Sequence, residues 1–266
     1  MTNTARLFLA TALLCAWGAV RGADIGGADV GGADILVGVS IGTTVGSADI
    51  AGSQNSVESA KLRFPVGVSP SITASEAFVR MPATTLDLLN SSMRRDMLDY
   101  LKADSVYNVM NTMEGFSHLN APLTDNYLQV QVTPVSRFTV KILPAKKGNI
   151  VMTLYTVGDA DSATDSELRF YDDSLNELPR DKFIKLASTD DFLDLKGVDG
   201  KTRKELRSIV PFPTVDYTVS PDGNTMKAEL TVGEFIGKED MERLAPYLHR
   251  ERTYIWNGKK WTLHPM

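Results

Sequence analysis

The period of apolar and polar positions along the chain changes near residue 104. Before that point apolar residues recur every three or four positions, which predicts one amphipathic helix or a pair of short helices. The stripe consists of Leu86, Leu89, Met93, Met97 and Leu101. Thr73 and Glu76 have capping-box spacing, which predicts the start of an earlier short helix that ends before Pro82. The same spacing at Thr84 and Asp87 predicts a second helix start.

Beyond residue 104 the period is two, which is typical of half-buried antiparallel strands. In residues 128–133 and 137–142, apolar side chains alternate with polar ones. The polar positions are Gln129, Gln131, Thr133, Arg137, Thr139 and Lys141. Residues 150–157 are apolar on both faces and predict a central strand, and residues 168–171 predict another.

The C-terminal part of the chain combines short helices with hairpins. The predicted helices are 201–208 and 238–247, and the predicted strands are 215–219 and 226–232, joined by a turn at 220–224. The second helix should be interrupted or end near Pro246. The chain closes with another hairpin around Asn257-Gly258, a dipeptide that favours a two-residue type I′ turn.

The type I′ turn would place Tyr254 opposite Trp261, with Trp256 on the same face of the hairpin. Aromatic side chains at strand spacing are typical of core packing. Alternatively, they could form a platform on which a sugar or a peptide side chain stacks. The ligand-binding prediction from the sequence therefore consists of Tyr254, Trp256 and Trp261.

These segments predict an α+β fold for residues 73–266, with N-terminal helices packed on antiparallel sheet and a second, hairpin-rich half. The predicted segments also allow this domain to consist of two subdomains, 73–197 and 198–266. Residues 23–72 are rich in Gly and Ser and predict a flexible, low-complexity linker. A five-residue Gly-Ala-Asp repeat at its start resembles pentapeptide-repeat β-helices, but so few units would not complete a stable solenoid.

The first 22 residues predict a cleavable signal peptide. Arg6 supplies a positive start, the next 14 residues are uncharged and mostly apolar, and Gly22 allows cleavage before Ala23. The apolar stretch is short for a bilayer span, and no transmembrane span is expected in the mature chain. A lipid anchor at Cys15 fits poorly because the bulky Leu14 precedes the cysteine. We therefore expect an exported protein, periplasmic or extracellular.

Charge and composition exclude several functions. Cleavage removes Arg6 and Arg21 from the 28 basic residues and none of the 33 acidic ones, so nucleic acid is not an expected partner. The short pairs Arg94-Arg95 and Lys259-Lys260 predict solvated surface instead. Cleavage also removes Cys15, the sole cysteine, which excludes a disulfide, a thiolate nucleophile and a cysteine-ligated metal.

No residue pattern predicts a catalytic site, a cofactor or a metal. The chain has three histidines, and none lies in a nucleophile-elbow, metalloprotease or phosphate-loop motif. The acidic cluster at residues 159–167 lacks the spacing of a helix-loop-helix calcium site. Paired carboxylates for glycoside hydrolysis stay open as an alternative, because such acids are distant in sequence and the fold alone brings them together.

Several motifs together resemble an uncharacterised family of exported proteins from gut and oral anaerobic bacteria. They are Met81-Pro82 with the helix at 86–89, the run 94–100, the segments 123–128 and 168–172, and the closing aromatic hairpin. The resemblance covers residues 76–263 and implies no activity, because the family is known only as a domain of unknown function. For a host of this kind, the Asp-Ser-aliphatic motifs at Ser105, Ser162 and Ser174 match O-glycosylation sites.

The sequence thus favours an exported, non-catalytic binding or interaction protein of the bacterial cell envelope. The expected partner is an envelope protein or a glycan. A carboxylate-dependent, glycan-directed hydrolase is the alternative.

Overall fold

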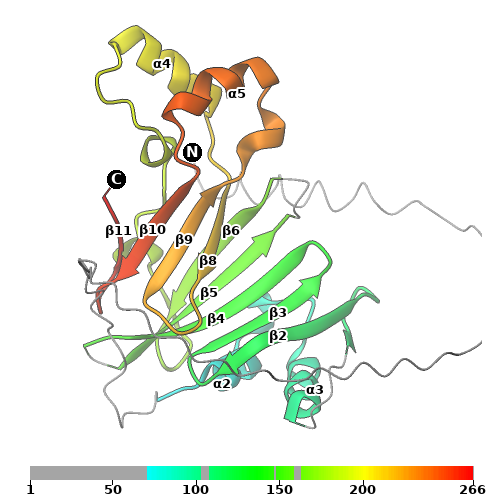
Figure 1. Ribbon diagram of the computed structural model, residues 1–266. Coiled ribbons are helices and arrows are strands. Elements are labelled where there is room, and N and C mark those ends of the chain that lie inside the picture. The colour runs from blue at the N-terminus through cyan, green and yellow to red at the C-terminus, as the bar shows by residue number, and fades with distance from the viewer. Residues whose placement is uncertain (1–70, 103–107, 147, 159–162, 266) are drawn as a thin grey trace, which may run out of the picture. The chain divides into compact units, whose positions relative to one another are not determined.

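The computed structural model describes residues 71–102, 108–146, 148–158 and 163–265, all within a compact unit of residues 60–266. These residues form four α-helices and two antiparallel sheets of seven and four strands, which confirms the predicted α+β class (Figure 1). The predicted signal peptide and nearly all of the predicted linker lie outside the described residues. None of the helices in the described part is long and apolar enough to cross a membrane.

Two helices precede the first sheet. Helix α2 (Ala74–Arg80) begins with the predicted capping box, in which the Thr73 hydroxyl accepts from the Glu76 amide and the Glu76 carboxylate accepts from the Thr73 amide. It ends before Pro82, as the pattern predicted. Helix α3 (Ser91–Lys102) is capped by the Asn90 side chain, and a 3₁₀ turn, η1 (Ala83–Thr85), precedes it. The second capping box predicted at Thr84 is therefore wrong.

Arg94 joins these elements. Only 1% of this residue is exposed, so the prediction of solvated surface is wrong for it. Its guanidinium donates to the backbone carbonyls of Phe78 (3.1 Å), Met81 (2.7 Å), Leu86 (3.0 Å) and Leu89 (2.6 Å). These carbonyls belong to the end of α2 and the connection to α3, where helical partners are lacking. A positive charge is favourable at this helix end.

The seven-stranded sheet is an antiparallel meander in which every strand pairs with its neighbour in sequence. The strands are β1 (Val109–Met110), β2 (Phe116–Thr124), β3 (Tyr127–Thr133), β4 (Ser136–Pro144), β5 (Asn149–Val157), β6 (Asp165–Tyr171) and β7 (Glu177–Leu178). Strands β3 to β6 include the four strand segments that the alternation predicts. Strands β1, β2 and β7 are not among the strands predicted from the sequence.

The second sheet follows after the 3₁₀ helices η2 (Arg180–Lys182) and η3 (Thr189–Phe192) and helix α4 (Gly200–Ile209). Its order is β11-β10-β9-β8, from strands β8 (Val215–Val219), β9 (Thr225–Leu230), β10 (Glu251–Trp256) and β11 (Trp261–Leu263). Between β9 and β10 lie η4 (Val232–Phe235), α5 (Lys238–Leu244) and η5 (Ala245–Tyr247). The predicted interruption near Pro246 corresponds to the change from α5 to η5.

The closing hairpin has a different register from the predicted one. Trp256 pairs with Trp261 and Tyr254 with Leu263, so four residues form the loop instead of two. The Asn257 side chain accepts from the amides of Lys259 and Lys260 and organises this longer loop. Gly258 has a φ of 83°, a value that glycine adopts readily.

Two apolar cores lie on opposite faces of the seven-stranded sheet. On one face α2 packs on β3 and β4, and α3 packs on β1 and β2, over side chains such as Leu128, Val130 and Phe138. Ile72, at the end of the predicted linker, is buried in this core and thus belongs to the folded domain. The other core joins β5 and β6 to the second sheet and draws residues from both sides of position 197. A division there does not separate two cores.

Candidate functional site

The predicted aromatic platform lies in the second core. Tyr254 and Trp256 are each 1% exposed and Trp261 is 2% exposed. The rings of Trp256 and Trp261 pack at 5.6 Å between centroids, and the Trp256 indole donates to the Pro144 carbonyl at 2.7 Å. The Tyr254 hydroxyl donates to the Lys185 carbonyl, and burial raises the pKa of this phenol. The structure favours core packing, the first of the two interpretations, and leaves these rings no face for a ligand.

A different surface combines exposure with regular polar chemistry. The apolar residues of β3 and β4 point to the helices, so the alternate residues point to the opposite face. Cross-strand pairing arranges them in two rows over β2, β3 and β4. The rows are His118–Gln131–Arg137 and Asn120–Gln129–Thr139, and together they are called the polar face below. The second sheet covers the continuation of this face over β5 and β6, where the side chains are mostly apolar.

The second row is a chain of side-chain hydrogen bonds. The Asn120 amide donates to the Gln129 carbonyl oxygen at 3.0 Å, and the Gln129 amide donates to the Thr139 hydroxyl at 3.1 Å. Asn120 and Gln129 are half-buried, and each keeps an N–H group outside these bonds. The amides are therefore held in fixed orientations and keep hydrogen-bonding capacity for a ligand.

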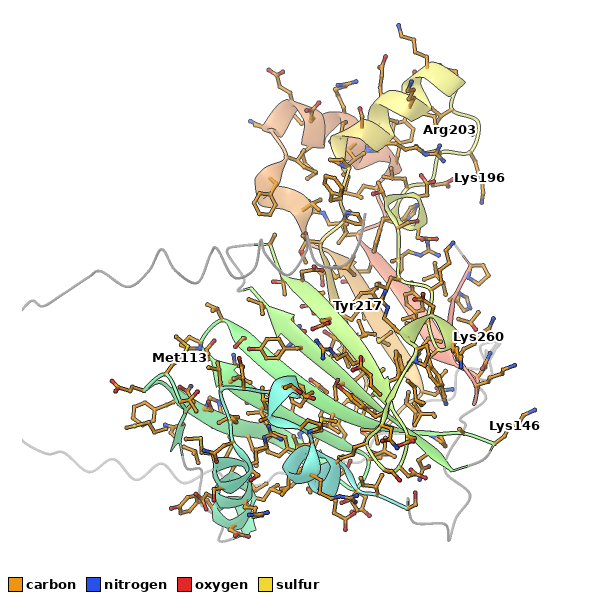
Figure 2. The ribbon with its side chains drawn as sticks, turned by 180° about the vertical axis from the view of Figure 1, so that it is seen from behind. Met113, Lys146, Lys196, Arg203, Tyr217 and Lys260 are labelled. Atoms are coloured by element: carbon orange, nitrogen blue, oxygen red, sulfur yellow. The ribbon has the colours of Figure 1, made fainter. Side chains whose placement is uncertain are left out.

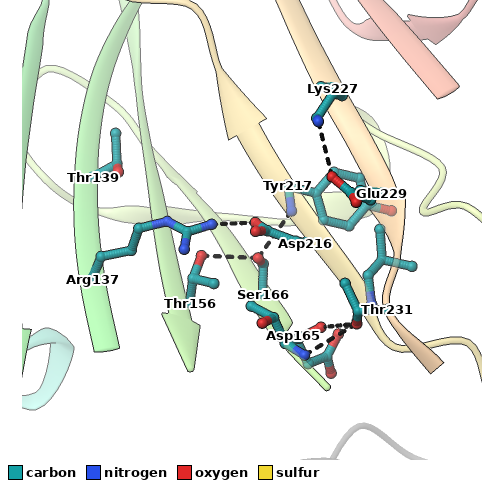
Figure 3. A network of polar contacts seen from close by, with 12 residues as sticks. Arg137, Thr139, Thr156, Asp165, Ser166, Asp216, Tyr217, Lys227, Glu229 and Thr231 are labelled. Carbon is teal, nitrogen blue, oxygen red and sulfur yellow. Dashed lines mark hydrogen bonds and ion pairs between the residues drawn. The ribbon is translucent and has the colours of Figure 1, made fainter. Parts of the chain in front are cut away.

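The first row ends in an ion pair with the second sheet. Arg137 reaches from β4 toward β8 and pairs with the Asp216 carboxylate, as Figure 3 shows. Beside this pair, Ser166 on β6 shares a hydrogen bond of 2.9 Å with Thr156 and accepts from the Tyr217 amide at 3.0 Å. Side chains thus join β6 to β8, and they fix the border of the polar face.

Lys141 lies one row further along β4 and is only 2% exposed. Its ammonium donates to the Pro221 carbonyl at 2.6 Å and lies 5.9 Å from the centre of the Tyr127 ring. Burial lowers the pKa of Lys141 to about 8, although the nearby Asp222 carboxylate opposes this shift. The contact attaches the β8–β9 turn to the first sheet and removes the lysine charge from the polar face.

The lowered pKa predicts a stability that changes with pH. Between about pH 8 and pH 10 the folded chain has lost the Lys141 proton while the unfolded chain keeps it, so the free energy of unfolding should rise. Above about pH 10 it should fall, because burial raises the pKa of Tyr127, Tyr155 and Tyr254 and only the unfolded tyrosines ionise there. Urea denaturation at several pH values measures both the rise and the fall in the free energy of unfolding.

The matched comparison uses two methionine variants. Lys141→Met should remove the rise above pH 8, and Lys196→Met, at an exposed lysine, should keep it. A rise that persists unchanged in Lys141→Met would contradict the assignment to this group.

An exposed apolar strip borders the polar face. Met110 on β1 pairs with Phe116 on β2, and the alternation along β2 places Phe116 on the same face as His118. Phe116 is 58% exposed and Met110 is 54% exposed. Met113, in the β1–β2 turn, is 72% exposed and lies at the outer edge of the sheet (Figure 2). An accessible aromatic ring therefore lies beside the hydrogen-bonding rows.

The other predicted sites have different surroundings. Ser174 is exposed in the turn between β6 and β7, where the Asp172 carboxylate accepts from its amide at 2.9 Å. Bonds of this carboxylate to Asn176 and Ser174 lower the pKa of Asp172. Ser105 and Ser162 lie outside the described residues. Glycosylation at these three serines stays a prediction.

Elsewhere on the described surface there is a shallow concavity near α4. It is lined by Leu193, Asp194, Lys196 and Arg203, two of which are labelled in Figure 2. Nη2 of Arg203 donates to the carbonyls of Leu195 and Val198, which holds this side chain against the segment before α4. Within the ranges that the structure describes, no group of three or more histidine or acidic side chains could hold a metal ion.

The sequence contained part of the polar face. The alternation singled out Gln129, Gln131, Arg137 and Thr139 as polar positions of half-buried strands. It missed the β2 members, His118 and Asn120, because the strand itself was missed. Their spacing of two residues is the signal that could have placed them on one face.

The comparisons with known proteins agree with this fold. A family model described as a protein of unknown function (DUF3256) matches residues 68–261. The chain belongs to this family. The resemblance inferred from the sequence motifs, to an uncharacterised family known from oral anaerobes, is thereby confirmed. No curated protein matches the chain.

A solved structure has the same fold. It is a domain of an uncharacterised protein from Porphyromonas gingivalis W83, with 19% sequence identity and a TM-score of 0.60. The similarity covers 75% of this chain and all of that one. At this identity the likeness concerns the fold alone, so the function of the DUF3256 domain must be argued from its own residues.

Proposed function

We propose that this protein is an exported, non-catalytic binding protein of the bacterial cell envelope, and that the polar face is its binding surface. The observation that carries the proposal is the hydrogen-bonded pair of half-buried amides, Asn120 and Gln129, on the same face of the sheet as the exposed Phe116 ring. Export is supported by the signal-peptide pattern of residues 1–22.

The polar face carries no unpaired charge in its two rows. Arg137 is the one charged residue among their six members, and Asp216 neutralises it. Side chains fixed by hydrogen bonds lose little rotamer freedom when a ligand binds, which favours recognition.

The hydrolase alternative gains no support from the shifted carboxyl groups. The described carboxyl groups with a shifted pKa are Glu76, Asp172 and Asp199, and the pKa of each is lowered by hydrogen bonds from neighbouring side-chain or backbone groups at caps and turns. A general acid in a glycosidase requires the opposite shift. We therefore retain binding without catalysis as the proposal.

The test uses the purified chain from Ala23 onward and the insoluble envelope of its own bacterium. We expect the protein to cosediment with the envelope, and the double variant Asn120→Ala with Gln129→Ala to bind at least about ten-fold more weakly, since each lost hydrogen bond costs about 1 kcal/mol. The control is Phe212→Ala, which truncates an exposed side chain far along the chain from β2.

Three results would contradict the proposal. They are absence of cosedimentation, equal binding by the double variant and the control, and release of soluble envelope fragments that indicates hydrolysis. Export is checked separately, because the N-terminus of the protein recovered from the host should be Ala23.

A further inference from the structure

We infer that the polar face binds an uncharged oligosaccharide. The inference rests on the proposed function and names its ligand class. Three properties of the described residues carry it: the charge balance of the polar face, the spacing of its amides, and the position of an exposed aromatic ring.

The charges at the polar face are already paired. Arg137 forms its ion pair with Asp216, and Lys141 is buried beneath the β8–β9 turn with its ammonium on the Pro221 carbonyl. The remaining members are an imidazole, three amides and a hydroxyl. Recognition of a phosphate, sulfate or uronate chain relies on free arginine and lysine side chains, so the balance of this face favours a neutral ligand.

The amides match the chemistry of sugar hydroxyls. A hydroxyl both donates and accepts hydrogen bonds, and an amide side chain offers two N–H groups and a carbonyl oxygen. Asn120, Gln129 and Thr139 lie on three adjacent strands, so they span about 10 Å at the usual strand spacing. Thr139 itself is only 4% exposed and holds the Gln129 side chain in place, so a sugar ring would meet the half-buried amides of Asn120 and Gln129 on two adjacent strands.

Phe116 adds a stacking surface along β2, two residues before His118 and four before Asn120. Its ring is 58% exposed on the outer side of β2, with Met110 as its cross-strand neighbour. The C–H face of a sugar ring packs well on an aromatic ring, while the sugar hydroxyls stay available to the neighbouring amides. A sugar can therefore place the C–H face of a ring on Phe116 and direct its hydroxyl groups to the neighbouring polar row.

An extended peptide fits the described surface less well. Strand addition requires a free run of backbone N–H groups, and the β2 edge is interrupted by Pro122 and by a register shift between Asn120 and Thr124. On the polar face itself, the rows over β2 to β4 hold no apolar side chain that would receive peptide side chains. A peptide partner is the alternative outcome of the test.

The experiment presents the mature chain to an array of neutral hexose, N-acetylhexosamine and uronic-acid oligosaccharides, followed by calorimetry with a neutral hexasaccharide that binds. We expect neutral chains to bind and acidic ones not to. Phe116→Ala should weaken binding at least ten-fold with an unchanged melting temperature. Phe212→Ala is the matched control, because Phe212 is 70% exposed in the segment that follows α4.

The envelope assay separates failure of this inference from failure of the proposed function. Periodate destroys vicinal diols of sugars, so cosedimentation with oxidised envelope should be lost. Cosedimentation that survives oxidation, depends on Asn120 and Gln129, and accompanies an empty array would overturn the glycan ligand while the proposed function stands. Binding that neither the double variant nor Phe116→Ala changes would overturn both.

Discussion

Replacing Arg94 with methionine is expected to lower the free energy of unfolding by about 4 kcal/mol. The guanidinium donates to four backbone carbonyls while the residue is 1% exposed, so methionine would leave these carbonyls buried without donors. A hydrogen bond from a charged donor contributes about 1.5–3 kcal/mol, and a buried polar group without a partner costs about as much. Since a domain is stable by only about 5–15 kcal/mol, the variant should unfold at a much lower urea concentration.

The neighbouring arginine provides the control. Arg95 is exposed, and Arg95→Met should change stability by no more than about 0.5 kcal/mol. Arg94→Lys should fall between the two, because an ammonium has three donors and cannot reach carbonyls in the fork geometry of a guanidinium. Equal urea midpoints for Arg94→Met and Arg95→Met would contradict the role of Arg94 as the link between α2 and α3.

Arg94 also shows where sequence reasoning ends. Nothing local distinguishes Arg94 from Arg95, and burial of the first follows from carbonyls that only the bend between α2 and α3 brings together. The capping box of Thr73 and Glu76 was predicted correctly because both partners lie within one helical turn. The carbonyls that Arg94 binds lie up to 16 residues away along the chain, so no local pattern could show this interaction.

The strands also differ in whether local sequence is enough to predict them. β3 and β4 were predicted from alternation, because their apolar faces repeat clearly. In β2 the apolar residues Leu119, Ala121 and Leu123 alternate, but Pro122 stands among them and argues against a strand, so its strand conformation depends on pairing with β3. The pattern therefore predicted the members of the polar face on β3 and β4. It did not predict its members on β2 or the exposed Phe116.

The aromatic hairpin was predicted as an element but with the wrong register. Asn257-Gly258 favours a two-residue turn, yet the Asn257 side chain satisfies two loop amides and allows Trp256 to lie directly opposite Trp261. Packing of the two indoles in the second core outweighs the local preference of the dipeptide.

Replacing Trp256 with alanine is expected to cost about 4 kcal/mol, as truncation of a buried tryptophan usually does. The side chain packs on Trp261 in the second sheet, and its indole N–H donates to Pro144 at the end of β4 in the first sheet. The loss should therefore loosen the contact between the two sheets. Trp256→Phe keeps most of the volume and removes the hydrogen bond, so it should cost about 1–2 kcal/mol.

Urea denaturation followed by circular dichroism measures these losses, with Phe212→Ala as the exposed-aromatic control. Tryptophan fluorescence adds a local reading, because Trp17 precedes the expected cleavage site and leaves Trp256 and Trp261 as the tryptophans of the mature chain. In Trp256→Ala the emission of Trp261 should shift to longer wavelength as water reaches the hairpin. A loss below about 1 kcal/mol combined with lost oligosaccharide binding would contradict the core assignment, and it would favour these rings over the polar face as the ligand site.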